Sequence, residues 1–156
     1  MAPAAIVIIV AVLEYIVFGF LVGRARGRYG VKAPATTGHE VFERYFRVQQ
    51  NTLETLVAFI PGISLFALFV NPNWAAWIGL VYILGRLLYF RAYVADPAKR
   101  GTGFLLSLSS IAILLQASGN SGPLLLSSID IADAGGKVNP TTASKTRRRV
   151  TNLSVT

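Results

Sequence analysis

Four long apolar runs constrain this chain more than any other feature of its sequence. They cover residues 4–22, interrupted only by Glu14, and residues 53–70, 74–90 and 104–119. The first three are close to the ~20 residues that an α-helix needs to cross a hydrocarbon core of ~30 Å. The fourth is shorter, and it either ends at the break over residues 119–123 or continues through it as a kinked helix. One core of a soluble domain could not bury this much apolar surface, whereas lipid can cover it.

The runs predict an all-α fold, a polytopic membrane protein with a four-transmembrane-helix bundle in residues 1–126. We expect the helices at about residues 4–22, 43–70, 74–94 and 103–121. Residues 127–156 are polar and rich in Ser and Thr, which indicates a disordered C-terminal tail or a remnant of an expression vector. A cleaved signal peptide is the alternative for the first run, but that run lacks a basic start and exceeds the usual 7–15 residues.

The basic residues lie mainly at the ends of the predicted spans. The first and third loops, with the adjoining helix ends, carry nine of the fifteen Lys and Arg residues. Both loops must lie on one face of the membrane, and their charge predicts the cytoplasmic face of a bacterial inner membrane or an endoplasmic reticulum-type membrane. The basic run Arg147-Arg148-Arg149 in the tail favours the opposite orientation, but it is far from the last span. The net charge of +8 therefore indicates contact with membrane lipids, and no motif of a nucleic-acid-binding module is present.

Two stripes of polar residues interrupt the second and third apolar helices. Arg47, Asn51 and Glu54 share one face of the second helix, and the third helix carries Tyr82, Arg86, Tyr89 and Tyr93 at spacings of four, three and four. A charge in a span costs at least ~2.5–3.5 kcal/mol on insertion scales, so it needs a partner. Arg86 either pairs with Glu54 or Glu14 as a structural ion pair, or belongs to a ligand site. An excess of guanidinium groups suits a ligand with carboxylates, and Glu54 suits an ammonium group on the same ligand.

The sequence gives little support for a thiol-based site or a metal site. The chain has no cysteine, and His39 is a lone loop histidine that we expect to be solvated, so no metal site is predicted. The spacing Gly19-x-x-x-Gly23-x-x-x-Gly27 either allows close helix packing or reflects the abundance of small residues in membrane helices.

Two segments resemble a known family. Residues 42–54 (FERYFRVQQNTLE) and residues 79–93 (GLVYILGRLLYFRAY), followed by Arg100, are similar to the signatures of the second and third helices in the membrane-associated proteins in eicosanoid and glutathione metabolism (MAPEG). The resemblance covers roughly residues 5–120. It implies a four-helix protomer, a homotrimer, and glutathione held between subunits near the cytoplasmic end.

The resemblance also implies roles for individual residues. Arg100 matches the catalytic arginine thought to stabilise the glutathione thiolate, and Arg26 matches an arginine contributed at the subunit interface. Further matches to glutathione contacts are Arg47, Gln49, Asn51, Glu54, Tyr89 and Tyr93, to which the polar stripe of the third helix adds Arg86. The chain departs from the pattern at Thr55, where leukotriene-synthesising members have a tyrosine, and at Pro61, which is displaced.

The function implied is that of an integral membrane glutathione transferase or glutathione-dependent peroxidase, with glutathione as cosubstrate and a lipophilic electrophile or peroxide as second substrate. The sequence leaves the identity of that substrate open, and isomerisation as well. The alternative is a non-catalytic lipid-binding or scaffold protein of the same fold. The family's accessory member lacks arginines corresponding to Arg47 and Arg100, and both are present here, which favours the enzyme.

Overall fold

The helices form a membrane-spanning bundle. The computed structural model describes the backbone of residues 2–136 and the side chains of residues 2–121. These residues form α1 (Ala2–Arg28), α2 (Glu40–Phe69), α3 (Pro72–Ala95), the one-turn 3₁₀ helix η1 (Pro97–Arg100) and α4 (Gly101–Gly136). Four helices are long and apolar enough to cross a membrane, the fourth of them over η1 and the first part of α4. The chain is therefore an integral membrane protein of the predicted all-α, four-span class.

The chain divides into two compact units, residues 1–120 and residues 121–156. Helix α4 runs from the first unit into the second and continues past residues 119–123 to Gly136. Residues 127–136, which the sequence assigns to the polar tail, are therefore helical, while residues 137–156 lie outside the described part of the chain.

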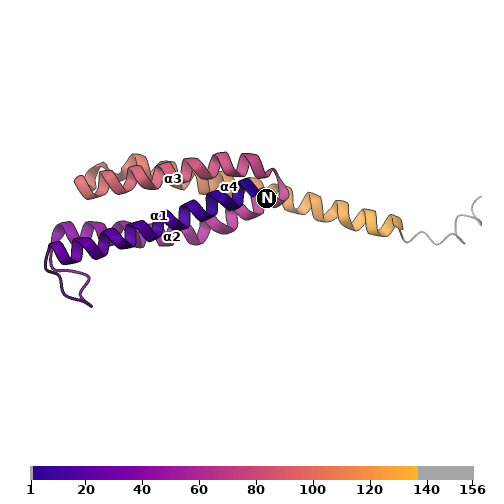
Figure 1. The fold of residues 1–156 in the computed structure, drawn as a ribbon. Helices are drawn as coiled ribbons and strands as arrows, with labels where there is room; N and C mark the ends of the chain where they lie inside the picture. Colours follow the sequence, from indigo (N-terminus) through magenta and orange to yellow (C-terminus); the bar gives the residue numbers. More distant parts are fainter. Residues whose placement is uncertain (1, 137–156) are drawn as a thin grey trace, which may run out of the picture. The chain divides into compact units, whose positions relative to one another are not determined.

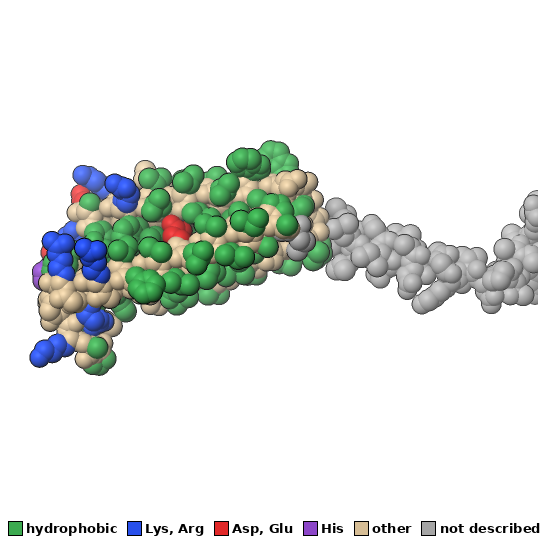
Figure 2. All heavy atoms as spheres, viewed as in Figure 1, with side chains coloured by type: hydrophobic (Ala, Val, Ile, Leu, Met, Phe, Trp, Pro, Cys, Tyr) green, Lys and Arg blue, Asp and Glu red, His purple; other side chains and the backbone are tan. Residues whose placement is uncertain are grey.

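In the first unit the spans run side by side and alternate in direction (Figure 1). The loop between α1 and α2 lies at the same end as the connection between α3 and α4, while the turn between α2 and α3 lies at the other end. Figure 2 shows the Lys and Arg side chains gathered at the loop end, with apolar side chains along the flanks. Exposed apolar residues such as Ile6, Phe20 and Val57 belong to these flanks, which is the surface expected to face lipid.

The core of the bundle is made by large apolar side chains from all four helices. Val7, Phe59, Ile63, Tyr82 and Leu114 are buried in one cluster. The rings of Phe59 and Tyr82 stack with their centroids 3.9 Å apart, which packs α2 against α3.

The three spaced glycines of α1 differ in their surroundings. A Cβ on Gly19 would stand 3.0 Å from Nε2 of Gln49 on α2. Around Gly23 and Gly27 there is open space within 4 Å. Backbone approaches backbone between α3 and α4, where a Cβ on Gly103 would stand 2.7 Å from the Cα of Tyr89, and a Cβ on Gly85 would stand 2.9 Å from the backbone nitrogen of Ser107. Glycine at 103 therefore lets α4 contact the backbone that carries Tyr89.

The helix ends at the loop side are set by polar side chains. His39 is half-buried and does more than face solvent: its Nδ1 accepts a hydrogen bond from the Val41 backbone N–H (3.2 Å), and its ring stacks on Tyr29 at 4.1 Å. The Glu43 carboxylate accepts from the Gly38 N–H at 3.0 Å, so both side chains satisfy backbone donors at the start of α2. Helix α2 therefore begins at Glu40, earlier than the apolar pattern indicates.

Candidate functional site

A cavity at the loop end of the bundle brings together four of the residues singled out in the sequence. It has a volume of about 440 Å³ and is lined by Asn51 from α2, Tyr89 and Tyr93 from α3, Arg100 from η1, and Gly101 and Phe104 from α4. We call it the Arg100 cavity. Its volume falls within the ~300–1,000 Å³ typical of small-molecule sites.

Side-chain contacts fix one wall of the Arg100 cavity. The Asn51 amide donates to the Tyr89 hydroxyl at 2.6 Å, which joins α2 to α3. The Tyr89 ring lies 5.4 Å from the Tyr93 ring and 6.5 Å from the Phe104 ring, between centroids. Tyr89 is 1% exposed, so it holds one orientation inside this contact set.

Arg100 is positioned by the short turn that precedes α4. The Asp96 carboxylate accepts from the Ala98 N–H at 3.0 Å and starts η1, and Arg100 is the last residue of that turn. Its guanidinium carbon lies 5.7 Å from the Tyr93 ring centroid. The ion pairs among the described side chains are Arg44–Glu40 and Lys99–Asp96, so no described carboxylate pairs with Arg100. Because α4 begins at Gly101, the positive end of its dipole lies at the same cavity, and the site favours an anion.

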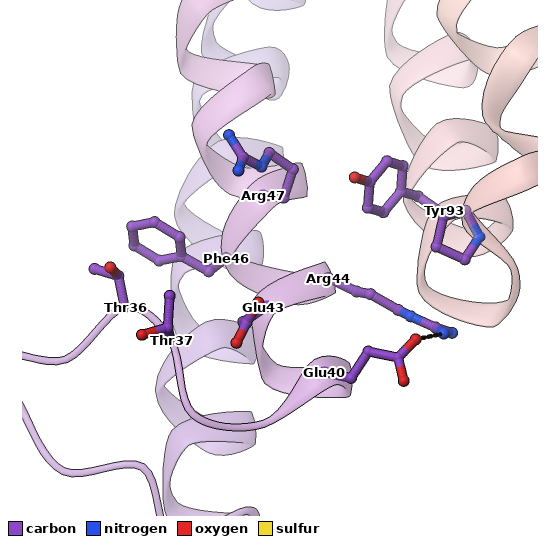
Figure 3. Close-up of a pocket in the computed structure, with 9 residues that line it drawn as sticks. Thr36, Thr37, Glu40, Glu43, Arg44, Phe46, Arg47 and Tyr93 are labelled. Carbon is purple, nitrogen blue, oxygen red and sulfur yellow. Dashed lines mark hydrogen bonds and ion pairs between the residues drawn. The ribbon is translucent and has the colours of Figure 1, made fainter.

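A second cavity of about 290 Å³ lies beside the first and shares Tyr93 with it. Figure 3 shows Tyr93 of α3 facing α2, which carries Arg44 and Arg47, with the loop between α1 and α2 nearby. Arg44 donates to the carbonyls of Val94 and Ala95, both at 3.2 Å, and pairs with Glu40. It thereby ties the start of α2 to the end of α3 and holds the two walls together. We call this the Arg47 cavity.

Arg86 lies beneath the Arg100 cavity rather than in its lining. It is fully buried, its Nη2 donates to the Thr52 hydroxyl at 2.9 Å, and its guanidinium carbon lies 4.3 Å from the Tyr89 ring centroid. Its Nε and Nη1 have no hydrogen-bond partner within the described residues. The contact with Tyr89 means that Arg86 supports the cavity wall from the interior.

The ion pair of Arg86 with Glu54 or Glu14, one of the two alternatives left open by the sequence, is not among the ion pairs of the described side chains. Glu54 is exposed on α2, and one carboxylate oxygen of Glu14 is buried without a described partner. Arg86 instead contacts the Thr52 hydroxyl and the face of the Tyr89 ring.

Three of the predicted glutathione contacts, namely Arg26, Gln49 and Glu54, do not line the Arg100 cavity. Arg26 donates to the carbonyl of Ala35 at 2.7 Å, and its guanidinium lies 4.8 Å from the Phe42 ring centroid, so it holds the loop after α1. Gln49 faces α1, where its Nε2 lies 3.0 Å from the place a Cβ on Gly19 would occupy.

The structure adds residues that sequence patterns did not single out. Phe104 lies one helical turn after Arg100, and that spacing would have indicated a shared face. Thr52 and Arg44 have no such signal, because their partners Arg86 and Val94 lie 34 and 50 residues away. Within the described residues, no group of three His, Cys, Asp or Glu side chains is placed to hold a metal ion.

The arrangement of these helices agrees with a comparison against known families. The family model described as "MAPEG family" matches residues 4–119. The chain belongs to the MAPEG family. The resemblance read from residues 42–54 and 79–93 is thereby confirmed, as is the four-helix membrane fold.

This MAPEG protein is similar in sequence to bacterial and mammalian proteins. An uncharacterized protein of Synechocystis sp. is 49% identical over 72% of this chain and 83% of its own. Human microsomal glutathione S-transferase 2 is 46% identical over 62% of this chain and 66% of its own. Bovine leukotriene C4 synthase is 35% identical over 64% of this chain and 66% of its own. The chain thus spans just under two thirds of the length of the two named enzymes.

Proposed function

We propose that this MAPEG protein is an integral membrane glutathione transferase or glutathione-dependent peroxidase acting on a lipophilic electrophile or hydroperoxide. The names of two relatives support glutathione chemistry in general. The observation that carries the proposal is the Arg100 cavity, in which three elements contribute to one lining: α2 with Asn51, α3 with Tyr89 and Tyr93, and η1 with Arg100. The family resemblance assigns all four residues to glutathione.

Glutathione is a peptide with two carboxylates, one ammonium group and one thiol. We place it across the Arg100 and Arg47 cavities, which are adjacent because both include Tyr93. Arg47 supplies a guanidinium fork for a carboxylate, and the tyrosine hydroxyls and the Asn51 side chain supply further hydrogen bonds. Arg86 acts in this proposal by holding Tyr89.

The chemistry proposed requires an ionised sulfur. A free thiol with a pKa near ~8.5 is only a few per cent ionised at pH 7. Arg100 and the N-terminal end of α4 favour the anion, which lowers the pKa of the bound thiol. In transfer, the thiolate sulfur forms a bond to an electrophilic carbon, and the leaving group departs with its electron pair. The exposed Phe104 gives the cavity an apolar side for a substrate that arrives from the bilayer.

A homotrimer completes the proposed site. Glu54 is exposed on α2, and neither it nor Arg26 and Gln49 line the Arg100 cavity of their own chain. A neighbouring subunit against α1 and α2 would bring such residues to a shared site, as the family resemblance implies for Arg26. The loop end is placed on the cytoplasmic side because the basic loops gather there.

The proposal is tested by assays with glutathione and a panel of lipophilic electrophiles and hydroperoxides. Arg100→Ala should lower kcat/KM about 10²-fold or more, because it removes a charge from the developing anion, while the Kd for glutathione changes less than about threefold. Arg91→Ala is the control, since Arg91 is exposed near the same end but lines neither cavity. An equal collapse of glutathione binding would contradict the activating role. Fatty-acid binding without glutathione binding or turnover would support the lipid-binding scaffold instead.

A further inference from the structure

A groove on the other side of α1 has no role in the proposed reaction. It has a volume of about 240 Å³ and is lined by Leu21, Arg24, Ala25, Arg28, Tyr29 and Tyr45. At 100° per residue, Arg24 and Arg28 each lie about 160° around α1 from Arg26, so the groove is separate from the loop that Arg26 holds. We call it the Arg24 groove.

Two guanidinium groups without described carboxylate partners face this groove. Arg24 and Arg28 are one helical turn apart and exposed, and neither belongs to the two ion pairs among the described side chains. Two acidic residues at the start of α2 are engaged elsewhere: Glu40 pairs with Arg44, and Glu43 accepts from the Gly38 N–H. The groove therefore carries a net positive charge that an anion can neutralise.

The aromatic side of the groove is fixed by packing. The Tyr29 ring stacks on His39 with centroids 4.1 Å apart, and the Tyr45 ring meets Phe90 edge-on at 5.6 Å. The Arg28 guanidinium carbon lies 5.9 Å from the Tyr29 ring centroid. The two tyrosines line the groove together with the two arginines, and phosphate oxygens can accept hydrogen bonds from tyrosine hydroxyl and guanidinium groups alike.

The depth of the groove in the membrane favours the phosphate of a lipid headgroup as the bound anion. The apolar run of α1 ends at Val22, so at 1.5 Å per residue Arg24 and Arg28 lie about 3 Å and about 9 Å beyond it. The headgroup layer on each side of a bilayer is roughly 5–8 Å thick, taking ~40–45 Å in total and ~30 Å of hydrocarbon. Leu21 lies on the apolar side of that boundary. The groove thus spans the level where a phosphate group joins its acyl chains.

We propose that the Arg24 groove binds the phosphate headgroup of an anionic phospholipid, with Arg24 and Arg28 on the phosphate and Leu21 against the start of an acyl chain. The site is independent of the glutathione proposal, because none of its lining residues lines the Arg100 or Arg47 cavity. It gives the basic loop end a specific lipid contact in addition to general attraction to anionic membranes.

Native mass spectrometry of the purified full chain in detergent tests the site. The chain is mixed with equal amounts of phosphatidylglycerol and phosphatidylcholine that carry the same acyl chains. We expect preferential binding of phosphatidylglycerol. Arg24→Gln with Arg28→Gln should weaken that binding about 10- to 30-fold, because each cationic side chain near the surface contributes about 1 kcal/mol. Arg24→Lys with Arg28→Lys keeps both charges and should keep the preference within about threefold.

The matched control removes two exposed charges elsewhere at the same end, by Lys32→Gln with Arg91→Gln. This pair should bind phosphatidylglycerol as the parent chain does. If both double Gln variants lost phosphatidylglycerol binding equally, the proposed groove site would be wrong, and the net charge of the loop end would explain the binding. No preference for phosphatidylglycerol would overturn it as well. Glycerol 3-phosphate is added as a soluble competitor, and displacement of the lipid at equal concentration would assign the groove to a soluble phosphate compound.

Discussion

The hydrogen bond between Asn51 and Tyr89 is the contact that most directly shapes the wall of the Arg100 cavity. At 2.6 Å it joins α2 to α3 within the half-buried lining. A typical bond of this kind contributes about 0.5–1.5 kcal/mol, and its loss leaves a partner unpaired. We expect Asn51→Ala and Tyr89→Phe each to weaken glutathione binding, and the double variant to lose about 1 kcal/mol less than the sum. The measurement is a double-mutant cycle on the Kd. As a control, the effects of Tyr15→Phe on α1 and Asn51→Ala on the Kd should be additive. Additive effects of Asn51→Ala and Tyr89→Phe would contradict the prediction.

Thr52 is the acceptor on which the fully buried Arg86 depends. Its hydroxyl accepts from Arg86 Nη2 at 2.9 Å, and two further nitrogens of that guanidinium already lack a described partner. Thr52→Val keeps the shape and removes the acceptor, so the free energy of unfolding should fall by about 1–3 kcal/mol. Reversible denaturation in mixed micelles measures this change. Thr102→Val is the same substitution at an exposed site and should stay within about 0.5 kcal/mol. Equal effects of both substitutions would show that Arg86 does not need Thr52.

At the scale of helices, the contact of α3 with α4 sets the position of Tyr89. Because a Cβ on Gly103 would lie 2.7 Å from the Tyr89 Cα, Gly103→Ala requires the two backbones to separate. We expect a loss of about 1–3 kcal/mol in unfolding free energy together with weaker glutathione binding. Gly23→Ala should be neutral or stabilising by up to about 1 kcal/mol, since open space surrounds Gly23. Thermal stability and glutathione titration of both variants check this, and a Gly103 variant indistinguishable from the parent would contradict the close packing.

At the scale of the whole molecule, we propose that the loop end lies in the cytoplasm. The chain has no cysteine, so single cysteines can report sidedness without background. Lys32 lies in the loop between α1 and α2, whereas Asn73 lies at the opposite end of the bundle. Both residues are exposed, and each can be replaced singly by cysteine. In sealed vesicles of known orientation, an impermeant maleimide should label residue 32 only from the cytoplasmic side and residue 73 only from the other. The reverse pattern would show that the basic loops do not set the orientation.

The four spans and most of the Arg100 cavity follow from local sequence patterns. Apolar runs of span length predict the helices, and regular spacing with a family motif groups Asn51, Tyr89, Tyr93 and Arg100. The ends of α2 do not follow from hydropathy, because His39 and Glu43 set its start through hydrogen bonds. The surroundings of Arg86 do not follow either. Its partners Thr52 and Tyr89 are decided by how α2 packs on α3, and a search for an opposite charge leads to Glu14 and Glu54 instead.

The ultraviolet absorbance of the glutathione thiolate tests the central claim most directly, namely that the Arg100 cavity binds and ionises glutathione. A drop of two units in the pKa of the bound thiol corresponds to about 2.7 kcal/mol of preferential stabilisation. Titration of the purified protein with glutathione at neutral pH should therefore give a saturable thiolate signal. That signal should fade as the pH is lowered through the bound pKa, and it should be absent in Arg100→Ala. Glutathione binding without any thiolate signal in the parent chain would contradict the activation of the thiol.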